Sequence, residues 1–134
     1  MKNLIIAVLL SFSLSVNAEA RTKQEAIDIC HKGNAQMCMG LGDDMKKRNP
    51  KEAKKYYDRG LQIVKKACSK NSADNCFVLG SYYAFGKGVK VNTKKAIATW
   101  KKAYSLFQKS CKKGNQTSCE SAEHCQAMIE MAPQ

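Results

Sequence analysis

Cysteines are the residues whose type and spacing most clearly predict chemistry in this 134-residue chain. Six of its seven cysteines form three similar nonapeptides, which read CHKGNAQMC at residues 30–38, CSKNSADNC at residues 68–76 and CKKGNQTSC at residues 111–119. The centre of each nonapeptide is rich in glycine, asparagine and serine, which favour turns. The pattern therefore predicts either three local disulfides across turns or cysteine pairs that bind a metal.

Zinc is the metal that such cysteines would bind, and the sequence favours disulfides over it. Zinc sites use shorter Cys-x2–4-Cys spacings and usually recruit histidine. The two histidines, His31 and His124, each stand directly beside a cysteine rather than at ligand spacing. We therefore predict no metal site and no cofactor.

Two further patterns could support nucleophilic catalysis, and both are weak. Ser110-Cys111-Lys112-Lys113 matches the S-x-x-K pattern of enzymes that cleave β-lactams, but the S-D-N and K-T-G motifs are absent. Cys125 and His124 are neighbours in sequence, so on a helix their side chains point about 100° apart. We predict no catalytic residue.

Residues 1–20 resemble a secretory signal peptide, with Lys2, an apolar run over residues 4–10 and small residues at positions 18 and 20. We expect cleavage after Ala18 or Ala20. The apolar run is shorter than the roughly 20 residues that span a bilayer. We therefore expect an exported mature chain with no membrane span, in an oxidising compartment where disulfides persist.

The chain is strongly basic, with 23 Lys and Arg against 11 Asp and Glu and a net charge of +12. Such a chain attracts polyanions and acidic proteins. The lysines occur in pairs that form either a solvated helix face or a docking surface for an acidic partner. Nucleic acid is not a predicted partner, because single-strand binding needs exposed aromatic residues among the basic ones. The pairs are Lys54-Lys55, Lys65-Lys66, Lys94-Lys95, Lys101-Lys102 and Lys112-Lys113.

Internal similarity predicts an all-α protein built from helical hairpins. Cys68 aligns with Cys111 at an offset of 43 residues, and Cys38 aligns with Cys76 at an offset of 38. Tyr57 then falls on Trp100, within apolar stripes of helical period that indicate core residues. The predicted helices cover residues 22–32, 35–46, about 50–68, 73–84, about 93–111 and about 117–131.

These helices give a short disulfide-stapled α-α solenoid over residues 21–134. Its first repeat covers about residues 35–70, its second about 73–113, and a capping helix about 117–131. Gly42, Gly60 and Gly80 lie inside helices, where glycine costs about 1 kcal/mol, so we expect a neighbouring helix to approach them closely. In the fourth predicted helix, Cys76, Leu79, Gly80 and Tyr83 form the expected core face.

In this arrangement each nonapeptide joins the end of one helix to the start of the next. Sequence alone does not fix disulfide connectivity, but the repeat favours Cys30–Cys38, Cys68–Cys76 and Cys111–Cys119. Cys125 is left over. It is either a buried free thiol, which Ala122 and Ile129 on the same helix face favour, or a thiol available for oxidation or an intermolecular bond.

Residues 76–103, CFVLGSYYAFGKGVKVNTKKAIATWKKA, resemble a Sel-one-like repeat, a relative of the tetratricopeptide repeat. The first unit, residues 38–68, keeps Leu41-Gly42 and Glu52 to Tyr57 but lacks the Gly-x-Gly-Val loop. The resemblance covers residues 30 to about 120, and residues 104–110 add about two helical turns to the usual compact unit. The matching positions in the second unit are Leu79, Gly80, Tyr83, Gly86, Gly88, Val89, Asn92, Lys95, Ala96, Trp100, Lys102 and Ala103.

The flanking cysteine pairs resemble the secreted, cysteine-rich bacterial branch of that family, in which each pair is a disulfide between neighbouring helices. The resemblance implies a periplasmic or secreted adaptor without catalytic activity. Its partner would be a protein or peptide in the cell envelope or outside the cell, held on the inner surface of the short helices and the 85–91 loop. The branch also implies an alternative, penicillin binding or weak β-lactamase activity. The basic charge adds a third, binding to an acidic envelope polymer.

Overall fold

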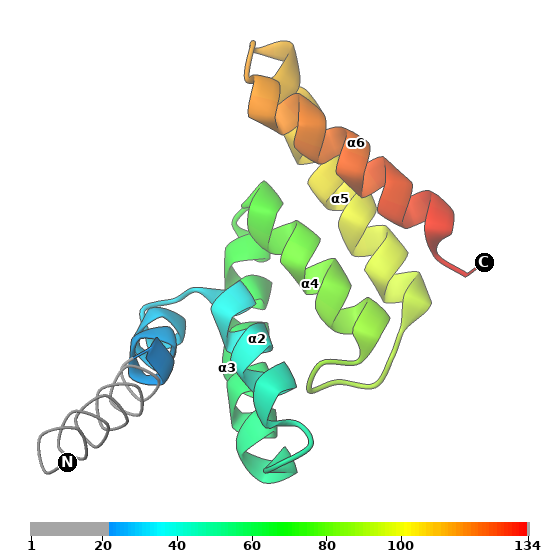
Figure 1. Ribbon diagram of the computed structural model, residues 1–134. Coiled ribbons are helices and arrows are strands. Elements are labelled where there is room, and N and C mark those ends of the chain that lie inside the picture. Colours follow the sequence, from blue (N-terminus) through cyan, green and yellow to red (C-terminus); the bar gives the residue numbers. More distant parts are fainter. Residues whose placement is uncertain (1–21, 134) are drawn as a thin grey trace, which may run out of the picture.

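The computed structural model describes residues 22–133, and this part of the chain is all-α, as predicted. The signal peptide predicted for residues 1–20 lies outside the described residues. Residues 22–31 form a first helix. The following helices are α2 (Ala35–Met45), α3 (Pro50–Ser69), α4 (Ala73–Phe85), α5 (Thr93–Lys112) and α6 (Gln116–Met131) (Figure 1).

The helices form a short solenoid in which each packs on its neighbours in sequence. α3 packs against both α2 and α4, and α5 packs against both α4 and α6 (Figure 1). α2 also contacts α4 directly, so helices from successive hairpins touch. None of the helices in residues 22–133 is long and apolar enough to cross a membrane.

One backbone turn recurs in all three nonapeptides and explains their composition. The third residue after the first cysteine has a positive φ in each turn: Gly33 at 110°, Asn71 at 66° and Gly114 at 98°. Glycine and asparagine are the residues that adopt this left-handed conformation most readily. Its amide donates to the carbonyl of that cysteine, and the next amide donates to the carbonyl five residues back. This pair of bonds is the Schellman motif, which ends a helix.

The residue after the left-handed one begins the next helix. Asn34 and Asn115 each accept a hydrogen bond from a backbone amide three residues ahead. Ser72 occupies the same N-cap position, but its hydroxyl accepts from the side-chain amide of Asn75 at 2.8 Å instead of from a backbone amide. Helix end and helix start are therefore compressed into a few residues. The second cysteine then lies on the first turn of the new helix, opposite the first cysteine.

Three disulfides join the helices across these turns, Cys30 to Cys38, Cys68 to Cys76 and Cys111 to Cys119. Their Cα atoms lie 4.8, 4.6 and 4.7 Å apart, respectively. In a chain-entropy description, closing a loop of this size contributes about 2.5 kcal/mol. Each hairpin junction is thereby held covalently in a domain too small for a deep core.

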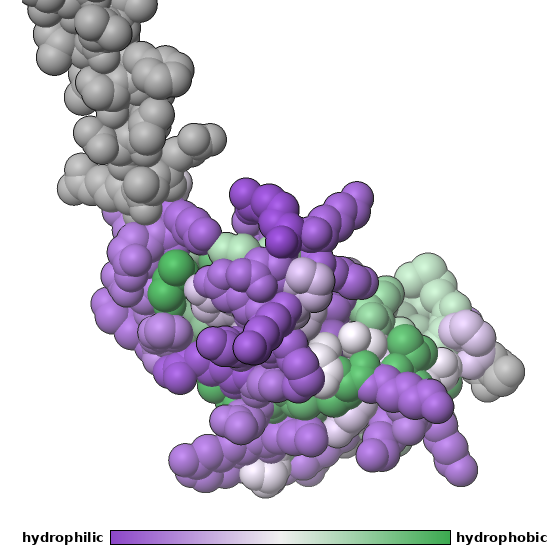
Figure 2. Space-filling model, turned by 90° about the horizontal axis from the view of Figure 1, so that it is seen from below, coloured by the Kyte–Doolittle hydropathy of each residue, from purple (hydrophilic) through white to green (hydrophobic). Residues whose placement is uncertain are grey.

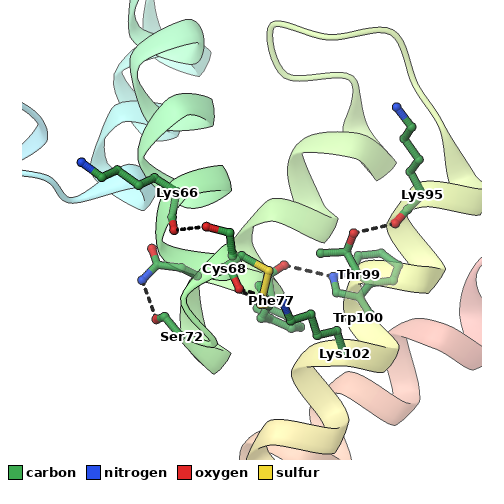
Figure 3. The surroundings of a disulfide bond; sticks show 11 residues. Lys66, Cys68, Ser72, Phe77, Lys95, Thr99, Trp100 and Lys102 are labelled. Atoms are coloured by element: carbon green, nitrogen blue, oxygen red, sulfur yellow. Dashed lines mark hydrogen bonds between the residues drawn. A yellow bond between two sulfur atoms is a disulfide. The ribbon is translucent and has the colours of Figure 1, made fainter.

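The interior glycines let aromatic rings of neighbouring helices lie against helix backbones, whereas the sequence predicts only a close approach of a neighbouring helix. A Cβ on Gly42 of α2 would overlap the ring of Tyr57, and a Cβ on Gly80 of α4 would overlap the indole of Trp100. These two contacts occupy equivalent places in the two repeats. Trp100 also donates its indole N–H to the carbonyl of Phe77 at 3.1 Å (Figure 3).

Tyr82 is the main core residue that the sequence did not identify. The expected core face of α4 included Tyr83, but Tyr83 is only partly buried and lies under the ammonium of Lys95. Tyr82 is fully buried against Gly60, and its hydroxyl donates to the carbonyl of Ala35 at 3.0 Å. It therefore links α4 to both helices of the preceding hairpin.

Basic side chains also join consecutive hairpins at equivalent positions. Arg59 of α3 donates to the carbonyl of His31 at 2.6 Å, and Lys102 of α5 donates to the carbonyl of Cys68 at 2.9 Å (Figure 3). Both carbonyls lie at the C-terminal end of an earlier helix, where a cation is favourable. The repeat offset of 43 residues relates Arg59 to Lys102, and their acceptor carbonyls lie within one residue of equivalent positions, so a similar contact recurs in both repeats.

Asp43 connects the first hairpin to the loop between α4 and α5. Its carboxylate accepts hydrogen bonds from the Tyr57 hydroxyl at 2.6 Å and from Lys87 of the loop. Burial raises the pKa of Asp43, but these two hydrogen bonds and the charges of Lys87 and Lys46 outweigh burial and hold the pKa below its ordinary value. The ionised carboxylate thus holds the loop against α2 and α3.

Replacing Gly42 and Gly40 with alanine tests the close packing of α2 against α3. We expect Gly42→Ala to lower the free energy of unfolding by about 1–3 kcal/mol, because the methyl group overlaps Tyr57. Gly40→Ala is the matched control in the same helix and meets nothing within 4 Å. It should raise stability by about 1 kcal/mol through helix propensity. Urea unfolding measures both, and equal effects would contradict the packing.

Asp43→Asn tests the bridge to the loop through its pH dependence. The folded pKa lies below the ordinary value of 3.8, so the stabilisation is complete above that value and disappears as pH falls through the folded pKa. Because the Asp43 side chain is 45% exposed, we expect a loss of about 1 kcal/mol or less at neutral pH. The difference from wild type should vanish in acid. Asp44→Asn, which removes only an exposed pair with Arg48, is the control, and a difference that persists in acid would contradict the bridge.

Candidate functional site

A hollow between α2 and α4 has an apolar floor and a polar rim. Its floor is formed by Met39 of α2 with Phe77 and Val78 of α4, and all three are partly buried. Gln36, Asp74 and Ser81 supply polar groups around them. The hollow has a volume of about 270 Å³.

The hollow continues onto α6 through two shared residues. Phe77 and Asp74 also line a smaller space of about 90 Å³ with Phe107, Ser121 and His124. The rings of Phe77 and His124 meet edge to face, with centroids 5.2 Å apart. We call the combined surface the inner groove, lined by Gln36, Met39, Asp74, Phe77, Val78, Ser81, Phe107, Ser121 and His124.

The spacing of residues in α4 places the groove on one of its faces. Asp74, Phe77, Val78 and Ser81 follow each other at three- and four-residue intervals, which places them on a single helix face. The opposite side of α4 carries buried core residues such as Leu79 and Gly80. The hydrogen bond from Trp100 to the Phe77 carbonyl fixes this face relative to α5.

The electrostatics of the inner groove differ from those of the remaining surface. Every member of the five lysine pairs is exposed, as both a solvated face and a docking surface require. The groove contains no lysine, and its one carboxylate, Asp74, forms no ion pair within residues 22–133. Seen from the end that carries the α2–α3 and α4–α5 loops, the surface is largely hydrophilic, with apolar residues gathered in a limited band (Figure 2). The groove therefore offers apolar contact with one acidic group.

The residues whose types could support catalysis or metal binding are not arranged for either in the described structure. Ser110 accepts a hydrogen bond from the Ser118 hydroxyl at 2.9 Å, and Lys113 forms no hydrogen bond to it in the described structure. Six cysteines are in disulfides. Within residues 22–133, no group of three His, Cys, Asp or Glu side chains could hold a metal ion.

Cys125 is unpaired and fully buried on α6. The pKa of its thiol is raised to about 11, mainly by burial and to a smaller extent by the negative charge of Asp74. Its neighbour His124 is exposed and contacts Phe77 instead. These two residues are therefore not arranged as a nucleophile and its base.

Two large apolar residues are exposed around the loop between α4 and α5, one at the end of α4 and one in the loop. Phe85 is 58% exposed and Val91 is 56% exposed. Gly86 and Gly88 turn the loop with positive φ, and side chains at either position would meet neighbouring atoms. The loop is thus a fixed element beside the helices.

Sequence reasoning placed binding on the short helices but did not identify the groove residues. Met39, Phe77 and Val78 lie in helices whose apolar residues also build the core, so composition alone could not separate the two roles. The detectable signal is that Phe77 and Val78 lie beside, rather than within, the face of α4 that holds Leu79 and Gly80.

Comparisons with known proteins give one relative at low coverage. No family profile and no solved structure match the chain. The chain is 38% identical over 72 residues to cytochrome c oxidase assembly factor 7 from Xenopus tropicalis. The match covers 53% of this chain but spans only 29% of that relative's length.

The burial of Cys125 predicts a native protein without a reactive thiol. At about pH 8, a thiol with a pKa of about 11 is ionised in roughly one molecule in a thousand, and this thiol has no exposed surface. Ellman's reagent should therefore leave the native oxidised protein unmodified and detect a single thiol after unfolding in guanidinium. Unfolded protein that has been reduced and freed of reductant should give all seven thiols. Rapid labelling of the native state would contradict the burial of Cys125.

Proposed function

We propose that this protein is an exported, non-catalytic interaction module of the Sel-one-like repeat type. Its inner groove binds a short segment of a partner protein. The observation that carries the proposal is the groove itself, in which Met39, Phe77 and Val78 form an apolar floor beside polar groups. Binding sites commonly combine such a floor with a few polar groups that orient the ligand.

The groove suits one apolar side chain followed by a polar or cationic one. The space of about 270 Å³ between α2 and α4 accommodates an apolar side chain against Phe77 and Val78. Asp74 lies at the junction with the smaller space, where its carboxylate can accept hydrogen bonds from a peptide amide or a basic side chain. Ser81 and Gln36 can pair with the peptide backbone.

Three disulfides support the proposed location outside the reducing cytosol, because disulfides persist in oxidising compartments. With the signal-like residues 1–20, this supports a periplasmic or secreted protein. The resemblance to the secreted cysteine-rich branch favours a bacterial cell envelope. The similar frog protein is named as an assembly factor, and an assembly role supports protein binding more than hydrolysis.

Hydrolysis of β-lactams finds no comparable support in the geometry. The S-x-x-K pattern places Ser110 against Ser118 at a disulfide-bonded turn, with no lysine hydrogen-bonded to it in the described structure. A serine nucleophile needs an adjacent base to activate it. We therefore propose binding as the function.

Peptide display can test the groove with a pair of matched variants. Peptides are first selected from a random display library on the oxidised wild-type protein. Ser81→Arg places a large side chain over the groove, and we expect it to weaken binding of the selected peptides by about tenfold or more. Ser105→Arg makes the same change at an exposed position of α5 and should alter affinity less than about twofold.

Two checks make the result decisive. Both variants must show the wild-type melting temperature, because Ser81 also donates a hydrogen bond to the Phe77 carbonyl. The selected peptides should share an apolar residue, which the groove floor requires. If both variants lost binding equally, or if Ser81→Arg had no effect, the groove would not be the binding site.

A further inference from the structure

A second hollow lies at the junction between the first helix and α3, and it shares no residue with the inner groove. It has a volume of about 550 Å³. His31 contributes from the end of the first helix, and Lys51, Lys55 and Arg59 contribute from α3. Glu52 and Tyr56 of α3 also line the hollow.

Three cationic side chains line this hollow at regular helical intervals. Lys51, Lys55 and Arg59 are each four residues apart, so they share one face of α3 and extend over about 12 Å. Lys51 and Lys55 are exposed and form no ion pair or side-chain hydrogen bond within residues 22–133. Two ammonium groups are therefore free to meet an anion.

The repeat architecture does not require these two lysines together. The equivalents of Lys51 and Arg59 in α5 are Lys94 and Lys102, but the equivalent of Lys55 is Ala98. Arg59 has a structural task, because it donates to the His31 carbonyl, as Lys102 does to the Cys68 carbonyl. The cationic row is thus specific to the first junction.

The spacing of the row fits an extended acidic peptide. Residues four apart on a helix rise about 6 Å along its axis. Alternate residues of an extended chain are separated by about 6.6 Å and point to the same side. Carboxylates on every second residue of a bound strand would therefore face successive cations of the row.

The remaining lining distinguishes a peptide from a phosphate polymer. The Glu52 carboxylate lies among the cations. Burial is the largest cause of the raised pKa of Tyr56, and the charge of Glu52 is the second. Peptide N–H groups can donate to Glu52, whereas a phosphodiester backbone offers acceptors only. A site that mixes charges in this way favours a ligand with both donors and acceptors.

We propose that this hollow, the outer basic pocket, docks an acidic peptide segment that carries carboxylates on alternate residues. This binding is independent of the inner groove. It gives the protein a second contact with a partner, or a contact with a second partner. The net charge of +12 on the whole chain also attracts an acidic peptide and so favours its association with the protein.

An NMR titration with designed peptides tests the pocket. The probe is a hexapeptide that alternates glutamate and serine, and its isomer carries the same glutamates in one block. With the ¹⁵N-labelled oxidised protein at physiological salt, we expect shifts confined to the 31 and 49–59 region of the chain. The alternating peptide should bind more tightly than the blocked isomer by about threefold or more.

Two matched double variants show whether the pocket or the total charge is responsible. Lys51→Gln with Lys55→Gln should weaken binding by about tenfold. Lys94→Gln with Lys101→Gln removes the same charge from exposed positions of α5 and should change affinity less than about twofold. Arg59 is kept in both variants, so the junction remains intact, and equal melting temperatures check this.

Several outcomes would overturn the proposal. Shifts spread over all the lysine-rich surfaces, or equal losses in the two variants, would show attraction to total charge only. Tighter binding of polyphosphate or single-stranded DNA at the same residues would assign the pocket to a phosphate polymer instead. Ser81→Arg should leave this titration unchanged, so failure of the inner groove and failure of the pocket are separable.

Discussion

The arrangement depends on one turn that occurs three times. A left-handed residue, Gly33, Asn71 or Gly114, ends each helix through a Schellman motif, and the next residue caps the following helix. This backbone geometry brings the two cysteines of each nonapeptide together, and the disulfide joins the two helices across the turn. Without the left-handed residue the helix would continue, and the second cysteine would not face the first. The covalent bonds and the backbone hydrogen bonds therefore support the same turn geometry.

The glycine–aromatic contacts determine how successive helices sit after each turn. Tyr57 against Gly42 and Trp100 against Gly80 set the depth of packing within the two repeats, while Tyr82 against Gly60 sets it between them. A side chain at any of these glycines would push two helices apart. The distance between α2 and α4, and hence the width of the inner groove, follows from these contacts. The helices α2 and α4 thus pack into the core with one face and line the inner groove with another.

Much of the architecture could be predicted because its signals are local. Asn49-Pro50 and Asn92 mark helix starts, the apolar stripes mark the long helices, and the spacing of the cysteines marks the turns. The groove could not be predicted in detail, because α4 is apolar on most sides, so the helical period alone does not show which apolar face packs into the core. The burial of Tyr82 in place of Tyr83 has the same cause. Contacts such as Arg59 with His31 join residues far apart in sequence and leave no local pattern.

The two proposed surfaces differ in the kind of specificity that they can provide. The inner groove is made of apolar and polar groups on four helices, α2, α4, α5 and α6, so its shape depends on the packing of the solenoid. The outer basic pocket depends on a row of exposed cationic side chains on α3, where spacing matters more than shape. Charge contacts of this kind raise the rate of encounter, whereas apolar contacts slow dissociation. A partner that used both surfaces would be attracted through α3 and retained through α2, α4, α5 and α6.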